Sequence, residues 1–401
     1  MNNITSFGKG ELMPQEEKLE LVSQEKSLFI GIPKETQLQE SRIAIVPEAA
    51  QLLVSYGHQV LIESGAGENS SFSDSQYSEA GAKIVYSSEE VYKADIILKV
   101  VPPTLEELAL MKGRQTLISA LQITTRDKSY IEELMAKKIN ALAYEFIQDD
   151  CGLMPLIRSM SEIAGNTSVL IASECMSNVN GGKGLMLGGI SGVTPTEVVV
   201  IGAGTVGEFA TRSAMGLGAS VKIFDNSLSK LRRIQNDLNT RVFTSVIQPK
   251  VLLKALKRAD VVIGALRSND ARSPCVVSEE MVKQMKDGAV VIDVSIDQGG
   301  CVETSEVTSH VDPIFVKHGV IHYCVPNIPS RVSRTASYSL SNLLTPILIN
   351  AGEHGGIESL FTSDIGVRKG VYVYHGLLTN QVVGEWFDLN YKDIDLLIAT
   401  I

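Results

Sequence analysis

The 401-residue chain is poor in the features that mark several large classes of protein. Aromatic residues make up 5%, with a single tryptophan, whereas 33 residues are glycine. No apolar stretch reaches the length of a membrane span without a charge, so we expect no transmembrane helix. Five cysteines are spread widely, and none forms a CxxC pair. An odd, scattered set predicts reduced and mostly buried thiols rather than a disulfide framework.

Positive charge is scarce as well. The formal net charge is −10 and the pI is about 5.3, and an acidic surface repels the phosphates of nucleic acids. We therefore expect neither a nucleic-acid partner nor a membrane partner. Residues 1–27 are polar and lack a secretory apolar region, which predicts a cytoplasmic protein with an N-terminal extension. That extension, with a helical turn or two around Gln15–Ser23, either covers a neighbouring subunit or forms a loose tail.

Short apolar runs alternate with helical patterns from Leu28 onward. The segment RIAIVPEAAQLLVSYGHQVLIESGAG is typical of strand, helix and strand, with Pro47 near the start of the helix and Gly57 at its end. Similar units continue to about Ile147. Repeated β-α units predict a mostly parallel sheet with helices on both faces.

A second series of units follows one long predicted helix, MPLIRSMSEIAGNTSVLIASECMSN, which fits a connector between domains. Strands are predicted near Arg241–Phe243, Val261–Gly264, Val290–Val294 and Ile321–Cys324. They suit a six-stranded dinucleotide fold. The chain from Thr335 onward is mainly helical in pattern. The predicted fold class is therefore α/β, with two domains joined by helices.

The strongest local pattern is a glycine-rich loop between a strand and a helix. The apolar run Val198–Ile201 leads directly into GAGTVG at residues 202–207. Gly202 permits the tight turn, Gly204 lets the backbone approach a pyrophosphate, and Gly207 permits close packing of helix on strand. The helix N-terminus offers free N–H groups to the phosphates. Thr205 and Val206 therefore belong to the predicted site.

Asp225 supports a nucleotide ligand, because it ends the next strand about twenty residues after the loop, where dinucleotide-binding folds place an acid. A carboxylate there accepts hydrogen bonds from the ribose hydroxyls and repels a 2′-phosphate. This favours NAD over NADP, although Lys230, Arg232 and Arg233 follow closely and leave NADP open. The plain alternative is a glycine-rich turn that binds no ligand.

A second glycine-rich element, IDQGG, follows the predicted strand VVIDV. Functional groups of open α/β sheets gather at the carboxyl ends of the strands. Asp297 in this element is therefore expected near the nicotinamide ring. Asp293 is the alternative acid, but it lies within the strand and is better explained as structural.

Taken together, these motifs resemble the alanine dehydrogenases, which share ancestry with the NAD-binding subunit of proton-translocating transhydrogenase. The resemblance is carried by GIPKE, ESRIAIVP, ILKV, MSEIAG, VVVIGAGTVG, IDQGG and VPNIP, and it covers Phe29 to about His375. It implies reversible, NAD-dependent oxidative deamination of L-alanine to pyruvate and ammonia, in a homo-oligomer that is often a hexamer. It also implies a Rossmann-type dinucleotide-binding domain, residues 156–333, inserted into a discontinuous flavodoxin-like or Rossmann-like substrate domain, residues 28–155 and 334–401.

The resemblance assigns roles to single residues by their motifs. Arg42 in ESRIAIV matches the arginine that grips the substrate carboxylate, and a guanidinium suits a bidentate carboxylate contact. Lys99 in ILKV matches the lysine beside the substrate carbonyl, and Asp297 matches the catalytic aspartate. Without the resemblance, Arg42 would be assigned to a surface ion pair and Lys99 to a solvated strand end. The remaining implied cofactor contacts are Ser161, Lys230, Leu266 and Asn327, of which Asn327 also lies near the substrate. No metal is expected.

One position departs from the family pattern. The family carries a catalytic histidine after the strand that follows Lys99, but here the segment LISALQITTRD holds Gln122 at that place. Glutamine can donate a hydrogen bond to a keto oxygen or an imine, but it cannot serve as a general acid or base. No other histidine is near in the sequence, and only folding could bring His354 or His375 close. The residues after Lys99, Val-Val-Pro-Pro, also remove a charged pair that is common in the family.

Three hypotheses follow from this departure. In the first, the chain deaminates alanine without the histidine, and Lys99 and Asp297 share the proton transfer, Lys99 as an acid whose pKa is lowered by burial. In the second, the substrate is another 2-amino or 2-imino acid. In the third, the chain is a catalytically weakened NAD-binding protein, either a sensor or a subunit that passes hydride to a partner.

Overall fold

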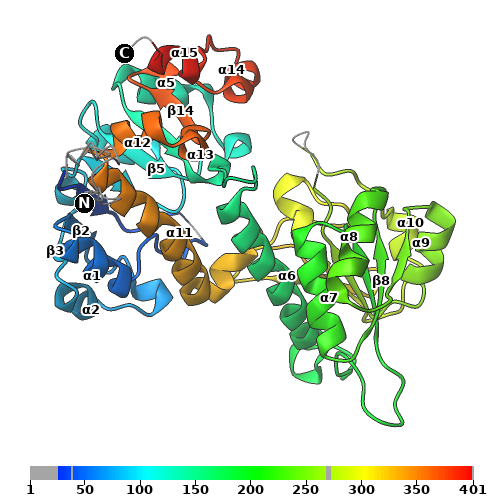
Figure 1. Ribbon diagram of the computed structural model, residues 1–401. Coiled ribbons are helices and arrows are strands. Elements are labelled where there is room, and N and C mark those ends of the chain that lie inside the picture. The colour runs from blue at the N-terminus through cyan, green and yellow to red at the C-terminus, as the bar shows by residue number, and fades with distance from the viewer. Residues whose placement is uncertain (1–25, 38, 268–271, 400–401) are drawn as a thin grey trace, which may run out of the picture.

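A computed structural model describes residues 26–37, 39–267 and 272–399 of the chain. Figure 1 shows two α/β halves side by side, with the helix α6 running from the first half to the second and α11 lying in the first half. The predicted N-terminal extension and its helical turns lie almost wholly outside the described residues.

The first sheet comes from the N-terminal part of the chain and from a hairpin near its C-terminus. Its strands are β1 (Phe29–Ile32), β2 (Gln59–Glu63), β3 (Lys83–Val85), β4 (Ile96–Leu98), β5 (Thr116–Ser119), β6 (Asn140–Ala143), β14 (Val371–Tyr374) and β15 (Leu377–Leu378). In the described part of the chain they pair in the order β15-β14-β6-β5-β4-β1-β2-β3. The pairs from β3 to β6 are parallel, whereas β14 is antiparallel to β6 and to β15. This confirms the predicted mostly parallel sheet.

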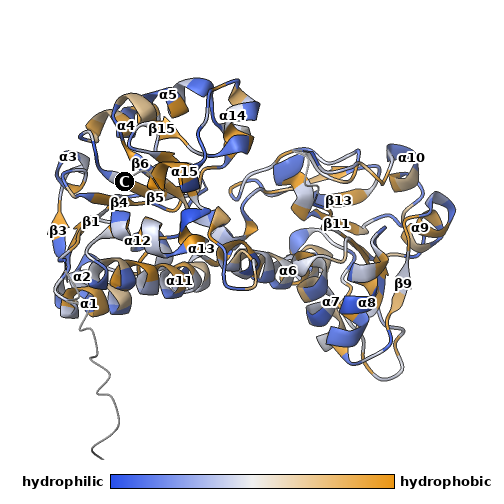
Figure 2. Ribbon diagram, turned by 45° about the horizontal axis from the view of Figure 1, so that its top comes forward, coloured by the Kyte–Doolittle hydropathy of each residue, from blue (hydrophilic) through white to orange (hydrophobic). Residues whose placement is uncertain are grey.

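Helices cover both faces of the first sheet. They are α1 (Pro47–Ser55), α2 (Asp74–Glu79), α3 (Ser88–Val91), α4 (Leu105–Leu110), α5 (Lys128–Ala136), α11 (Ser333–Glu353), α12 (Ile357–Ser363), α13 (Ile365–Arg368), α14 (Gln381–Phe387) and α15 (Ile394–Ile398). Because both faces are covered, β4, β5 and β6 are buried along their whole length. Figure 2 shows orange, the colour of apolar residues, in the middle of this sheet.

The second sheet is built from one continuous stretch of the chain. Its elements are β7 (Glu197–Ile201), α7 (Thr205–Gly216), β8 (Ser220–Phe224), α8 (Leu228–Leu238), β9 (Phe243–Ser245), α9 (Pro249–Leu256), β10 (Val261–Gly264), α10 (Glu279–Val282), β11 (Val290–Asp293), β12 (Ile314–Lys317) and β13 (Val320–Tyr323). Across the described residues, the strand order is β12-β13-β11-β10-β7-β8-β9. All pairs are parallel except β12 with β13.

One strand prediction needs correction in this half, and one strand was not predicted. The strand predicted at Arg241–Phe243 is β9, which begins two residues later, at Phe243, where it pairs with Lys222 of β8. The edge strand β12 was missed altogether. It has only three apolar residues before Lys317, none of them fully buried, and Val316 is exposed.

The long connector helix is confirmed as α6 (Pro155–Met176). It packs along α7 of the second half, and α11 of the first half also contacts it. The chain returns from β13 through a short 3₁₀ helix, η6 (Ile328–Val332), into α11. The cysteines differ in part from the expectation, since Cys151 and Cys275 are exposed whereas the other three are buried.

Candidate active site

The loop at residues 202–207 joins β7 to α7, as the sequence predicts. Gly202 has a φ of +114°, and a Cβ there would lie 2.3 Å from the carbonyl oxygen of Ala265. A Cβ on Gly207 would lie 1.9 Å from the carbonyl oxygen of Gly202, whereas a Cβ on Gly204 would meet no described atom within 4 Å. No described side chain caps α7, so the N–H groups of Thr205 and Val206 begin the helix beside open space. This arrangement fits a bound pyrophosphate.

Asp225 fixes this loop from the end of β8. One carboxylate oxygen accepts the backbone N–H of Ala203 at 2.7 Å, and the other accepts that of Ser227 at 2.7 Å. Each oxygen can accept a further hydrogen bond. The carboxylate is therefore held at the loop with capacity left for two hydroxyl groups.

The other predicted cofactor contacts lie around the loop. The backbone nitrogen of Leu266 lies beside the first glycine of the loop, whereas Lys230 is exposed on α8. Ser161 lies on α6, about one turn before Gly165. A Cβ on Gly165 would lie 2.5 Å from the carbonyl oxygen of Val206. Ser161 therefore lies near the place where α6 packs closely on the start of α7.

Arg42 lies in the loop between β1 and α1 and is buried, with 7% of its surface exposed. Its Nε and Nη2 donate to the two carboxylate oxygens of Glu40 at 2.8 and 2.6 Å. Burial alone would raise the pKa of Glu40, but Arg42 holds it below its usual range. The third nitrogen, Nη1, is directed at the sulfur of Met160, 3.4 Å away. It has no oxygen partner among the described residues, so this edge of the guanidinium remains available to a carboxylate.

Asn327 and Asp297 bring the second half of the molecule to Arg42. Asn327 has left-handed backbone angles (φ 59°, ψ 47°), and its Nδ2 donates to Glu40 at 2.9 Å. Asp297 lies in the 3₁₀ helix η5 (Val294–Gln298), directly after β11. Asp297 is exposed, but neighbouring protein atoms partly desolvate its carboxylate and raise the pKa of Asp297 to about 6. The backbone amide of Asn327 and the charge of Arg42 oppose this rise, and Asp293 adds to it.

Lys99 follows β4, but its ammonium group is enclosed. Its Nζ lies 3.3 Å from Glu35 and 3.0 Å from Glu107, and the side chain is 0% exposed. Burial alone would lower the pKa of Lys99, yet the two carboxylates raise it above its usual value. The expectation of a lowered pKa at Lys99 is therefore wrong, because the fold supplies two anions that the neighbouring sequence does not show.

Gln122 lies at the same edge of the first sheet, at the end of β5. Its backbone is left-handed (φ 49°, ψ 54°), and its side chain is exposed. The N–H groups of Leu121 and Gln122 donate to one carboxylate oxygen of Glu145, at 2.7 and 3.2 Å. Within the described residues, no hydrogen bond joins the Gln122 side chain to Arg42 or Asp297. Glu145 thus holds the turn but leaves the amide free.

One histidine reaches this cluster, and it is neither of the two considered from the sequence. His354 is exposed at the end of α11, and His375 is exposed in the turn between β14 and β15. The Nε2 of His310, in contrast, lies 3.4 Å from the backbone oxygen of Asn327. The residues of the cluster to which the motifs assigned no role are Glu35, Glu40, Glu107, Glu145, Met160 and His310. Of these, Glu35, Glu40 and Met160 lie inside the quoted motifs GIPKE, ESRIAIVP and MSEIAG, whereas the other three lie outside them.

Comparison with known proteins agrees with this architecture. The family model "Alanine dehydrogenase/PNT, N-terminal domain" matches residues 31–164, and its C-terminal counterpart matches residues 168–381. The chain belongs to the alanine dehydrogenase/PNT family. The C-terminal domain of this family is a nucleotide-binding domain. The substitution of a family histidine at Gln122 remains an inference from the motifs.

Relatives of this family cover almost the whole chain. An alanine dehydrogenase of Mycolicibacterium smegmatis is 38% identical over 373 residues, which is 93% of this chain and 100% of the relative. A solved L-alanine dehydrogenase structure matches with a TM-score of 0.83 and 36% identity, covering 90% of this chain and 99% of the other. A transhydrogenase structure from Sinorhizobium meliloti, 22% identical over 88% of this chain and 99% of the other, shares the fold with a TM-score of 0.76.

Proposed function

We propose that this chain catalyses the reversible, NAD-dependent oxidative deamination of L-alanine to pyruvate and ammonia. The observation that carries the proposal is the meeting of Arg42 with Asp297 around Asn327, at the carboxyl ends of strands from both sheets. A cation whose Nη1 has only the sulfur of Met160 as its partner among the described residues, and a carboxylate with a raised pKa, suit a 2-amino acid. The names of the curated relatives point to the same substrate.

In this proposal Arg42 binds the substrate carboxylate through the guanidinium edge that faces Met160. Asp297 carries the proton transfer, because its pKa of about 6 lets it exchange protons near neutral pH. The ammonium group of alanine would lose a proton to solvent, and hydride transfer from Cα to NAD⁺ would leave an iminium ion. Asp297 would accept a proton from the water that adds to the iminium carbon and return it to the amino group, which departs as ammonia while the carbonyl of pyruvate forms and its hydroxyl proton passes to solvent. Deamination should therefore gain rate as the pH rises through about 6, the value at which this carboxyl ionises.

NAD is the cofactor that we propose, and bound NAD⁺ supplies the hydride acceptor. The open space before Gly204 and the free start of α7 fit its pyrophosphate, and Asp225 fits its adenosine ribose. The carboxylate of Asp225 would repel a 2′-phosphate. Leu266, Ser161, Lys230 and Asn327 are proposed to complete the contacts.

Lys99 and Gln122 define a second candidate function. Lys99 is buried between two carboxylates with a raised pKa, so it is a poor proton donor, and Gln122 cannot ionise. Both features favour a protein that binds NAD and turns over alanine slowly, or that acts on another 2-amino or 2-imino acid. In either case we propose that Lys99 balances the charge of Glu107 and stabilises the ionised form of Glu35, and that Gln122 contributes an amide hydrogen bond.

The deciding experiment is NADH oxidation with pyruvate and ammonium, for the wild type beside Gln122→His and Asp297→Asn. We expect measurable wild-type turnover and a decrease of about 10²–10⁴-fold in Asp297→Asn. A wild type without turnover, together with activity in Gln122→His, would favour the second candidate. NADH binding by fluorescence in all three proteins is the control that separates lost chemistry from lost cofactor.

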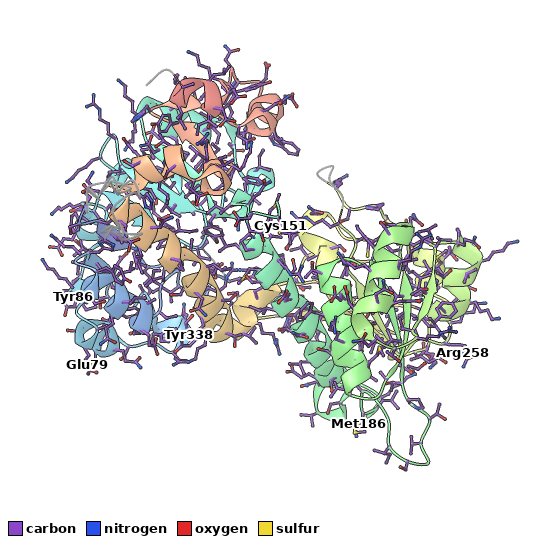
Figure 3. The ribbon with its side chains drawn as sticks, in the orientation of Figure 1. Glu79, Tyr86, Cys151, Met186, Arg258 and Tyr338 are labelled. Carbon is purple, nitrogen blue, oxygen red and sulfur yellow. The ribbon has the colours of Figure 1, made fainter. Side chains whose placement is uncertain are left out.

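The domain boundaries and the assembly are also proposals. We propose a cofactor domain at residues 156–333 inserted into a substrate domain at 28–155 and 334–401, because the chain passes between the sheets through α6 and through η6 (Figure 1). A homo-oligomer, a hexamer by resemblance, is supported by exposed apolar side chains near the C-terminal end of α6 and after it: Leu170, Val179, Met186, Ile190 and Val193. Figure 3 labels Met186 at the lower end of the cofactor half.

The helices of the described residues include none long and apolar enough to cross a membrane. We propose cytoplasmic residence from the scattered cysteines, none of which forms a CxxC pair. A small 2-amino or 2-oxo acid and ammonia are the partners that the proposed reaction requires.

A further inference from the structure

Asn327 makes two contacts that fix its place. Its side-chain Nδ2 donates to Glu40, the residue that pairs with Arg42. Its backbone oxygen lies 3.4 Å from the Nε2 of His310. Its backbone amide also lowers the pKa of Asp297. Asn327 therefore joins the group that binds the substrate carboxylate to the group that moves the proton.

Asn327 has left-handed backbone angles, which asparagine adopts more readily than most residues other than glycine. The N–H and the oxygen of Asn327 belong to different peptide planes, so a partner on the oxygen fixes the rotation between them. His310 is that partner, and it acts from the segment between β11 and β12.

His310 is itself fixed from the other half of the molecule. Its backbone N–H donates to the side chain of Gln39 at 3.3 Å. Since the partner of Nε2 is a carbonyl oxygen, Nε2 must carry the hydrogen. Nδ1 is buried and has no hydrogen-bond partner among the described residues. Burial lowers the pKa of His310, and Arg331 adds to this decrease. The carbonyl of Asn327 and the charge of Glu40 oppose it only in part. The neutral ring is therefore the main form near neutral pH.

We propose that His310 is a positioning residue for the reaction, which it serves by holding the Asn327 backbone so that Asp297 and the Glu40–Arg42 pair keep their places. The proposal rests on the proposed function for its kinetic consequences. The contacts of His310 with Asn327 and Gln39 exist without substrate. We assign His310 no contact with the reacting atoms or with the cofactor.

The charged groups around the affected carboxyl set the expected direction. Asp297 is influenced by Arg42, by Asp293 and by the amide of Asn327. If the Asn327 backbone is released, Asp297 loses the amide contact that lowers its pKa. Its pKa should then rise above the value of about 6.

The test compares His310→Leu with His310→Gln. Leucine removes the donor, whereas glutamine can donate an amide hydrogen bond to the same oxygen but cannot ionise. We expect His310→Leu to raise the KM for L-alanine about three- to tenfold, the effect of one lost hydrogen bond, with a smaller effect on kcat. The acid limb of kcat/KM should move to higher pH by about half a unit or more. His310→Gln should restore both quantities. His318→Leu, at an exposed histidine paired with Glu279, is the matched control.

A measurement without turnover separates this inference from the proposed function. The carboxyl titration of Asp297 can be followed by carbon NMR in the cofactor-free full-length protein, with the signal assigned by its loss in Asp297→Asn. A higher titration midpoint in His310→Leu that returns in His310→Gln supports the inference, even if alanine is not turned over. An unchanged midpoint in His310→Leu, or equal shifts in both variants, would overturn it.

Discussion

Glu35 provides a sharp test of the buried ion pairs around Lys99. Burial raises the pKa of Glu35 from 4.5 to about 7, with Lys99 and the N–H of Val100 opposing the rise and Glu40 adding to it. The folded pKa is therefore higher than that of the unfolded chain. As the pH rises from 4.5 towards 7, the unfolded chain ionises first, and stability is lost over this interval.

The size of the effect follows from the shift. One pKa unit corresponds to about 1.36 kcal/mol, so Glu35 removes about 3 kcal/mol of unfolding free energy from the wild type between about pH 4.5 and about pH 8. Glu35→Gln keeps the shape and cannot titrate. We expect the unfolding free energy of the variant minus that of the wild type to increase by about 3 kcal/mol over the same interval.

Urea unfolding at a series of pH values measures this difference. Trp386, the single tryptophan of the sequence, lies on α14 in the same half as Glu35 and reports its unfolding by fluorescence. Glu89→Gln, at an exposed carboxylate on α3, is the matched control, and its difference from the wild type should change little with pH. A difference between Glu35→Gln and the wild type that stays constant with pH would refute the reasoning.

Three further predictions concern the cofactor loop and the assembly. Gly204→Ala should fold normally but weaken NADH binding at least about tenfold. Gly207→Ala should lower the melting temperature strongly, because its Cβ would lie 1.9 Å from a backbone oxygen. Equal melting temperatures of the two variants would argue against this loop geometry. Asp225→Asn should reduce the preference for NADH over NADPH, measured as the ratio of the two dissociation constants, and an unchanged ratio would remove Asp225 from the cofactor site. Ile190→Asp, at a position with 62% of its surface exposed, should lower the mass found by analytical ultracentrifugation without changing NADH binding, whereas an unchanged mass would place the interface elsewhere.

Local and periodic signals accounted for much of the fold. The strand predicted at Val261–Gly264 has these bounds in the structure, and the long connector appears as α6. Both predictions succeed because a buried parallel strand and a long helix impose a continuous or regular pattern on neighbouring residues. The edge strand β12 gave no such signal, since it has four residues, IFVK, and none of them is fully buried.

Some residues of the candidate site could be predicted from the local sequence, and others could not. The sequence by itself determined the glycine-rich loop and Asp225, because the turn, the helix start and the acid lie within one β-α-β unit. Only the tertiary structure decided the state of Lys99, whose two carboxylate partners set its charge and burial. It alone also joined Asn327 to Glu40, 287 residues away, and His310 to Gln39, 271 residues away. Such contacts leave no local trace, because a buried polar group is satisfied by whatever the fold brings beside it.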